Sequence, residues 1–281
     1  MGPAVEASGG SAGNTAAGVA SLGGRAAYFG KTASDQLGEI FAHDIRAQGV
    51  YFQTKPLESV PPTARSMIFV TEDGERSMNT YLGACVELGP EDVEPEVVAQ
   101  SKVTYFEGYL WDPPRAKDAI RETARIAHAN GRETAITLSD SFCVHRYRDE
   151  FLDLMRSGTV DIVFANKQEA LALYETEDFD LALEKLSKDC KLAAVTLSEE
   201  GSVVVRGEER VRVGATPIAQ VVDTTGAGDL YAAGFLHGYT TGRSLEDCSK
   251  LGNLAAGIVI GQIGPRPMVS LETAAKQAGL A

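Results

Sequence analysis

Residues 160–197 read VDIVFANKQEALALYETEDFDLALEKLSKDCKLAAVTL, and this stretch indicates the fold class of the whole chain. It opens with an apolar run that predicts a strand over 160–165 and closes with another over 192–197. Between them, apolar residues recur at helical spacing over 167–174 and 179–188. Strand, helical segment and strand in this order are typical of a right-handed βαβ unit, in which parallel strands form a sheet covered by helices.

The same alternation extends upstream of the quoted stretch. Strands and helices are predicted in turn at 102–106, 114–130, 134–138 and 144–156. We therefore expect an α/β protein, a three-layer sandwich with a central, mostly parallel sheet.

Nearer the N-terminus the pattern is less regular. A Gly- and Ser-rich opening leads into a helix of small residues that ends near Leu22, and 25–29 predicts a short buried strand. Asp35 has the features of an N-cap for an amphipathic helix that Gly49 ends.

Two hairpins interrupt the alternation of strands and helices. β runs at 64–70 and 76–81 flank an Asp-Gly pair, which is a strong hairpin signal. We expect this hairpin to form a β-lid outside the sheet, so that residues 63–81 are the lid and residues 1–62 and 82–281 the α/β domain. A second hairpin is predicted from 202–206 and 210–213, and the chain after Asp223 is predicted to be helical.

The composition excludes several functions. Lys and Arg number 26 and Asp and Glu 39, a net charge of −13, which disfavours nucleic-acid binding because such binding neutralises phosphates with basic side chains. No signal-peptide pattern and no apolar run of the roughly 18 residues needed to cross a bilayer is present. The 4 cysteines and 4 histidines are scattered and form no metal-binding motif. We expect a cytoplasmic protein without nucleic-acid or membrane partners.

The clearest chemical signal is VVDTTGAGD, residues 221–229. β-branched residues lead into a Gly-rich turn, and a helix is expected to start at about Gly228. Backbone N–H groups in such a turn can approach an anion closely, and the helix N-terminus adds partial positive charge. Asp229 would be a base that accepts the proton of an attacking hydroxyl, while the amides of Gly226, Ala227 and Gly228 stabilise the transferred phosphoryl group. The alternative is a helix whose first turn carries an acid because its dipole favours one.

This turn resembles a family signature. Asp223 to Asp229 match the form D-T-x-G-A-G-D of the ribokinase-like (phosphofructokinase B-type) carbohydrate and nucleoside kinases. Gly9-Gly10 with Asn14 resembles the family's first signature, and Asn166 to Glu169 resembles its N-x-x-E motif. The three motifs are in family order and spread over most of the chain.

The resemblance implies roles for further residues. Asn166 and Glu169, three apart on one helical face, would organise Mg²⁺ through its waters near the phosphates of ATP; the alternative is a solvated polar face. Thr225 would also bind the nucleotide, and Asn253 resembles a residue near adenine, although Ala- and Gly-rich helices are often only tightly packed. The cofactors implied are ATP and Mg²⁺, and a monovalent cation is left open.

The acceptor is assigned by the same resemblance. Gly9, Gly10 and Asn14 would bind sugar hydroxyls; without the family they would be an ordinary glycine-rich helix start. Segments 73–82 and 138–142 look most like adenosine kinases, in which Phe142 would stack on the base; the alternative is a core phenylalanine.

Three functions are therefore weighed. The first is transfer of the γ-phosphoryl group of ATP to a primary hydroxyl of a nucleoside, adenosine being favoured. The second is a sugar or sugar-acid kinase acting on ribose, fructose or 2-keto-3-deoxygluconate, and the third is a non-catalytic nucleotide-binding remnant.

Family members begin with a strand ahead of the Gly-Gly signature, and that strand carries an Asp that binds acceptor hydroxyls. The present chain starts too late to include either, so we expect a missing N-terminal segment. Whether the enzyme is a monomer or a homodimer is left open.

Overall fold

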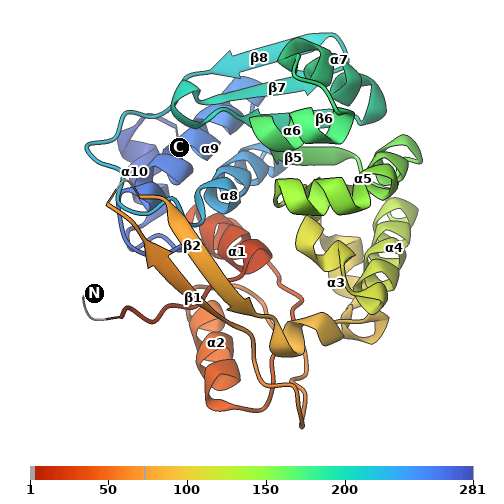
Figure 1. Cartoon of the computed structure of the whole chain (residues 1–281), viewed down its shortest axis with the longest axis vertical. Coiled ribbons are helices and arrows are strands. Elements are labelled where there is room, and N and C mark those ends of the chain that lie inside the picture. Colours follow the sequence, from red (N-terminus) through yellow and green to blue (C-terminus); the bar gives the residue numbers. More distant parts are fainter. Residues whose placement is uncertain (1–3, 73, 281) are drawn as a thin grey trace. The chain divides into compact units, whose positions relative to one another are not determined.

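A computed structural model describes residues 4–72 and 74–280 (Figure 1). The chain divides into two compact units. The first contains the residues up to Val86 and those from Thr216 onward, and the second runs from Glu87 to Ala215.

The second unit is built on a six-stranded sheet in the order β3-β4-β5-β6-β7-β8 (Figure 1). Neighbours from β3 to β6 are parallel, and β7 and β8 add an antiparallel hairpin at the edge. The predicted mostly parallel sheet and second hairpin are thus confirmed. The strands are β3 (Val103–Glu107), β4 (Glu133–Thr137), β5 (Ile162–Asn166), β6 (Leu192–Thr196), β7 (Ser202–Arg206) and β8 (Glu209–Val213).

Helices of the second unit pack on one face of this sheet. Alternate side chains such as Ile136, Val163 and Ala193 are register neighbours and so share that face. They form one buried core with apolar residues of the helices, including Ile120 and Phe151. The helices are α3 (Pro95–Gln100), α4 (Pro114–Ala129), α5 (Ser141–Arg156), α6 (Lys167–Tyr174) and α7 (Phe179–Asp189), with 3₁₀ turns η2 (Pro90–Asp92), η3 (Gly108–Trp111) and η4 (Ser198–Glu200).

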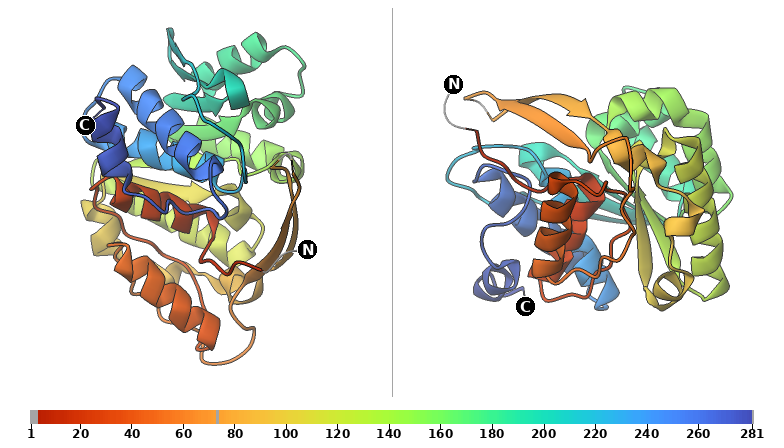
Figure 2. Two further views of the ribbon diagram at one scale, coloured as in Figure 1. Left: turned by 90° about the vertical axis from the view of Figure 1, so that its left-hand side faces the viewer. Right: turned by 90° about the horizontal axis from the view of Figure 1, so that it is seen from below.

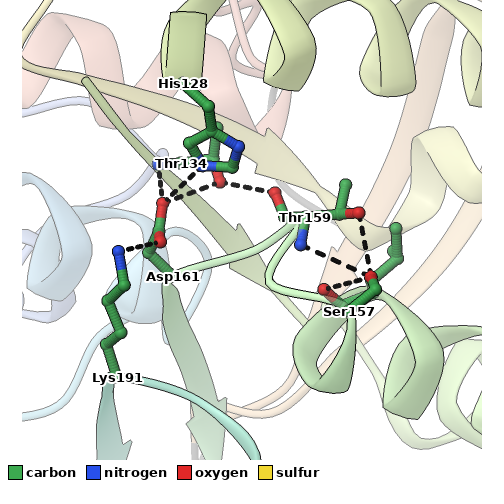
Figure 3. Close-up of polar contacts among 7 residues, drawn as sticks. His128, Thr134, Ser157, Thr159, Asp161 and Lys191 are labelled. Carbon is green, nitrogen blue, oxygen red and sulfur yellow. Dashed lines mark hydrogen bonds and ion pairs between the residues drawn. The ribbon is translucent and has the colours of Figure 1, made fainter. Parts of the chain in front are cut away.

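A buried carboxylate joins the N-terminal ends of three strands (Figure 3). Asp161, directly before β5, is 2% exposed. It accepts hydrogen bonds from the Thr134 amide of β4 at 2.8 Å and pairs with Lys191, directly before β6, at 2.6 Å. His128 Nε2 lies 2.8 Å from Oδ2, the oxygen that accepts the Thr134 amide, whereas Lys191 pairs with Oδ1. Burial raises the pKa of this carboxyl, but these partners outweigh burial and the pKa is lowered.

The first unit begins with two adjacent helices, α1 (Ser11–Ser21) and α2 (Gln36–Ala47), which run side by side in both views of Figure 2. Ala16 of α1 packs in a buried cluster with Ile45 of α2 and with Phe52. Asp35 caps α2, accepting the Gly38 amide at 2.8 Å, which confirms the predicted cap.

The expected strand at residues 25–29 is wrong. Ala27 forms only an isolated parallel bridge with Tyr51, and Ala33 another with Leu57. Two separate bridges do not make a continuous ladder, so apolar composition alone misled the prediction.

The β1 (Arg65–Val70) and β2 (Arg76–Tyr81) strands form a separate two-stranded antiparallel sheet, followed by η1 (Gly83–Glu87). The predicted hairpin outside the main sheet is confirmed, although Asp73 of its turn lies outside the described residues. Its function as a lid stays a prediction, as does the division of the chain into lid and α/β domain.

The C-terminal part of the first unit is helical, as predicted, with α8 (Ala227–Thr240), α9 (Leu245–Ile260) and α10 (Leu271–Gln277). Helices α8 and α9 lie in close contact. A Cβ on Gly234 would lie 2.3 Å from the Leu251 carbonyl oxygen, and one on Gly252 would lie 2.8 Å from the Tyr231 ring. Glycine therefore permits the close approach of the two helices.

Candidate active site

The Gly-rich turn enters α8 through a backbone conformation that requires glycine. Gly226 is the N-cap, with φ 83° and ψ 0°. A Cβ at this position would lie 2.7 Å from the carbonyl oxygen of Pro265. Any other residue would be strained here, by the left-handed backbone and by this contact.

Two of the three predicted amides of the turn remain open to a ligand. The Ala227 amide donates to Thr224 O at 3.3 Å. Within the described residues, the amides of Gly226 and Gly228 have no acceptor, and no side chain caps α8. A Cβ on Gly228 would meet nothing within 4 Å. Two unpaired amides at a helix N-terminus favour an anion.

The carboxylate of Asp223 holds the Gly-rich turn in place through two backbone hydrogen bonds. Its two oxygens accept the amides of Thr225 at 2.9 Å and of Gly264 at 3.0 Å. Burial raises the pKa of this carboxyl, but the hydrogen bonds outweigh burial and lower it. The hydroxyl of Thr225 is buried beside the carboxyl of Asp223 and contributes to the lowering of its pKa.

Asp229 lies in the first turn of α8 and faces the N-terminus of α1. Ser11 Oγ donates to Asp229 Oδ1 at 2.7 Å, and Asn14 Nδ2 donates to Asp229 Oδ2 at 2.9 Å. Burial raises the pKa of Asp229, and the hydrogen bonds of Asn14 and Ser11, with the charge of Arg76, partly oppose it. A carboxylate with a raised pKa is a stronger proton acceptor than an ordinary aspartate.

The acceptor signature adjoins this carboxylate. Gly10 is the N-cap of α1, with φ 90°, and Asn14 is 4% exposed. Arg266, 8% exposed, donates to the carbonyl of Gly9 at 3.2 Å. Sequence reasoning missed Ser11 and Arg266, although the position of Ser11 inside the signature was a usable signal.

The turn of the β1–β2 hairpin contacts the segment before the Gly-rich turn. Thr224 donates its amide at 3.2 Å and its hydroxyl at 3.1 Å to the carbonyl of Gly74. Arg76 donates to the same hydroxyl at 2.8 Å. From the sequence, Arg76 was predicted only as the first residue of a hairpin strand. In the structure its positive charge acts on both Asp223 and Asp229.

The second unit holds Asn166 and Glu169 in a mutual capping box at the start of α6. Glu169 accepts the Asn166 amide at 2.9 Å and its Nδ2 at 2.7 Å, while Asn166 Oδ1 accepts the Glu169 amide at 2.9 Å. Burial raises the pKa of Glu169 to about 7, with a contribution from Asp140. The alternative of a solvated polar face is wrong for Glu169, which is 4% exposed. The metal role stays a prediction.

Phe142 stands in the first turn of α5 and is 82% exposed. The alternative of a core phenylalanine is therefore wrong, and an exposed aromatic ring is available to a ligand. Asn253 is buried in α9, next to the tightly packed Gly252, and its contact with adenine stays a prediction. Among the described residues no cluster of three potential metal-binding side chains occurs.

The fold and this site define a phosphotransferase that uses an alcohol as acceptor. Residues 4–273 match the pfkB family carbohydrate kinases, and the chain belongs to this family. The predicted α/β class and the ribokinase-like resemblance are thereby confirmed.

The chain is also similar to solved structures and curated proteins of individual kinases. The crystal structure of adenosine kinase from Sinorhizobium meliloti is 89% identical, with a TM-score of 0.98 over 99% of this chain and 85% of that chain. A probable sugar kinase from Rhizobium etli CFN 42 is 76% identical, with a TM-score of 0.99 over 100% and 85%. Adenosine kinase of Saccharomyces cerevisiae is 29% identical over 92% of this chain and 78% of its own length. In the described residues, no helix is both long and apolar enough to span a membrane.

Proposed function

We propose that this chain is an ATP-dependent adenosine kinase, which transfers the γ-phosphoryl group to the primary hydroxyl of adenosine and yields AMP. The observation that carries the proposal is the position of Asp229 in the first turn of α8, beside the open amides of Gly226 and Gly228. A base next to an anion site is what phosphoryl transfer to an alcohol requires.

Asp229 would accept the hydroxyl proton as the oxygen attacks phosphorus. Burial raises the pKa of Asp229, which makes its carboxylate a stronger proton acceptor than an ordinary aspartate. The amides of Gly226 and Gly228 would stabilise the negative charge on the transferred group, whereas the Ala227 amide already donates to Thr224 O. Arg76 adds a positive charge near the turn. These local charges offset the repulsion that a net charge of −13 imposes on an anionic substrate.

The residues present fit a magnesium nucleotide. Mg²⁺ bound to ATP would neutralise phosphate charge and polarise the transferred group. Both oxygens of Glu169 are already hydrogen bonded to Asn166, which suits contact through metal-bound water rather than direct ligation. Thr225 would bind the nucleotide, and Asn253 would lie near adenine. Dependence on a monovalent cation would be seen as a difference in turnover between K⁺ and choline buffers.

Adenosine is favoured as acceptor for two reasons. The 89% identity to the Sinorhizobium meliloti adenosine kinase supports it, and Phe142 offers an exposed ring for stacking on a base. Gly9, Gly10 and Asn14 would bind the ribose hydroxyls. We also propose a cytoplasmic monomer or homodimer, which cell fractionation and light scattering would test.

The acceptor is tested by a coupled ADP-release assay. Adenosine, ribose, fructose and 2-keto-3-deoxygluconate are compared at equal concentration with Mg·ATP. We expect the highest kcat/KM with adenosine. A higher value with a sugar or sugar acid would establish the alternative acceptor, and ATP binding without turnover on any acceptor would show a non-catalytic chain.

The base is tested by Asp229→Asn. We expect turnover to fall at least 10²-fold with little change in ATP affinity, because the carboxamide keeps the shape but cannot accept the proton. Asp247→Asn is the matched control, since Asp247 also lies in the first turn of a helix but pairs on the surface with Ser244 and Lys250. Near-normal turnover of Asp229→Asn would end the assignment.

A further inference from the structure

Arg266 is a buried cation whose side-chain hydrogen bonds, within the described residues, go to neutral acceptors. It follows α9 and is 8% exposed. Its guanidinium donates to neutral acceptors, namely Gln48 Oε1 at 3.1 Å, Gly9 O at 3.2 Å and Asn14 Oδ1 at 3.4 Å. Burial lowers the pKa of the Arg266 guanidinium, and the charge of Asp44, which forms no direct ion pair with it among the described residues, partly opposes that effect. Burial of a charge without a direct counter-ion is costly, so a functional reason is to be sought.

One of these neutral acceptors connects Arg266 to the candidate base. The Asn14 side chain receives the Arg266 Nε donor on Oδ1 and donates from Nδ2 to Asp229 Oδ2 at 2.9 Å. A guanidinium only donates and a carboxylate only accepts, so the amide satisfies both neighbours in a single orientation. If the Asn14 amide turned by 180°, its NH₂ group would face the N–H donor of Arg266. The hydrogen bond from Arg266 therefore disfavours that orientation.

The other oxygen of Asp229 is held independently. Ser11 Oγ donates to Oδ1 at 2.7 Å, and Thr15 Oγ1 donates to the Asp229 carbonyl at 3.1 Å. Each carboxylate oxygen has capacity for about two hydrogen bonds. Asp229 therefore keeps acceptor capacity for a substrate hydroxyl while its plane is held from two sides.

We infer that Arg266 is a positioning residue, which fixes the Asn14 amide and through it the orientation of the Asp229 carboxylate. The inference rests on the proposed role of Asp229 as base. Arg266 donates to Asn14 and acts on Asp229 only through that amide.

The inference predicts that loss of Arg266 changes both kcat and the pH dependence of kcat. The Asn14 hydrogen bond favours the charged form of Asp229 and lowers its pKa against the effect of burial. When the amide is no longer held, that contribution weakens, and the acidic limb of the kcat profile moves to higher pH. The other groups that act on Asp229 are Ser11 and the charge of Arg76, and both remain in place in Arg266 variants.

The test is a double-mutant cycle in the full chain, with Arg266→Met, Asn14→Ala and the combined variant. With Mg·ATP and the best acceptor from the coupled assay, we expect Arg266→Met to lower kcat about tenfold and to shift the acidic limb upward. In the Asn14→Ala background the same change should alter kcat less than about twofold, because its route to Asp229 is already broken. Arg266→Lys, which keeps a buried donor, should restore part of kcat.

Controls separate orientation from folding. Arg243→Met removes another arginine of the same unit, one that donates to the Leu280 carbonyl at 2.7 Å, and it should leave kcat and the pH profile unchanged. Thermal melting and active-site titration normalise each rate to folded enzyme. A shifted acidic limb in the folded fraction of Arg266→Met supports the inference even if that variant is less stable.

Two results would overturn the inference. One is an unaltered kcat and pH profile in Arg266→Met, and the other is full additivity of Arg266→Met with Asn14→Ala. If Asp229→Asn abolishes turnover while Arg266→Met has no effect, the positioning role alone fails. If Asp229→Asn turns over normally, the proposed base fails and the positioning role with it.

Discussion

Removal of the buried carboxylate of Asp161 is expected to destabilise the second unit (Figure 3). In Asp161→Ala the Thr134 amide loses its side-chain acceptor at 2.8 Å, and Thr134 is 0% exposed. An unsatisfied buried donor costs about 1–3 kcal/mol, and the lost side-chain packing adds to it. Lys191, whose side chain is 67% exposed, returns to water at little cost. We therefore expect a loss of about 3 kcal/mol of unfolding free energy.

Two companion variants separate the charge from the hydrogen bonds. Asp161→Asn keeps an oxygen for the Thr134 amide but loses the charge, so we expect the free energy of unfolding to fall by about 1.5 kcal/mol. Lys191→Met removes only an exposed partner and should cost less than about 1 kcal/mol. The exposed Asp153, in the same unit, supplies the control Asp153→Asn, which should be neutral.

The assay uses the single tryptophan of the chain as a local reporter. Trp111 is fully buried in the core of the second unit, so its fluorescence in guanidinium chloride reports the unfolding of that unit. Circular dichroism follows both units together. We expect the loss of unfolding free energy to be largest for Asp161→Ala, smaller for Asp161→Asn and smallest for Lys191→Met.

The pH dependence supplies a further check on Asp161. Its pKa is lowered from 3.8 in the folded state, so its contribution is fully present above that value and is lost as pH falls through the folded pKa. The difference between wild type and Asp161→Asn should therefore narrow as pH decreases from about 5 to 3. Equal stability of wild type and Asp161→Ala at pH 7, within about 0.5 kcal/mol, would refute the reasoning.

Two further predictions concern ligand binding and titration. Phe142→Ala should raise KM for adenosine about fivefold and leave KM for ATP unchanged, because a stacking contact contributes about 1 kcal/mol; Phe142→Tyr should behave as wild type, and an unchanged KM in the alanine variant would exclude stacking. The pKa of Glu169 is raised from 4.5 to about 7 by burial, so the folded state takes up a proton and wild-type stability falls as pH rises through this interval. Glu169→Gln lacks that loss, so its Trp111-monitored stability relative to wild type should improve from pH 5 to pH 8, and a constant difference would contradict the shift.

Much of the second unit was predictable because its signals are local. The apolar runs around residues 160–197 and the helical spacing between them follow from the direction of side chains in each element and the burial of its apolar residues. The boundaries of α6, β7 and β2 agree with the structure. Caps such as Asp35 are also local, since the side chain bonds an amide three residues away.

The prediction at residues 25–29 was wrong for the opposite reason. Whether an apolar run becomes a strand depends on a partner that supplies a continuous ladder, and Tyr51 supplies only one bridge. The Asp161 network had no sequence signal either. Its partners Thr134 and Lys191 lie at the ends of other strands and meet only when the parallel strands align in register.

The sequence by itself determined the succession of strands and helices, the glycine turn ahead of α8 and the presence of an acid in its first turn, because backbone geometry and capping act over a few residues. Only the tertiary structure brought Ser11 and Asn14 onto Asp229, across 218 and 215 residues, and Arg266 onto Asn14 across 252. Contacts at such separations leave no periodicity to read. They form because the N-termini of α1 and α8 converge, and the orientation of the carboxylate follows from that packing.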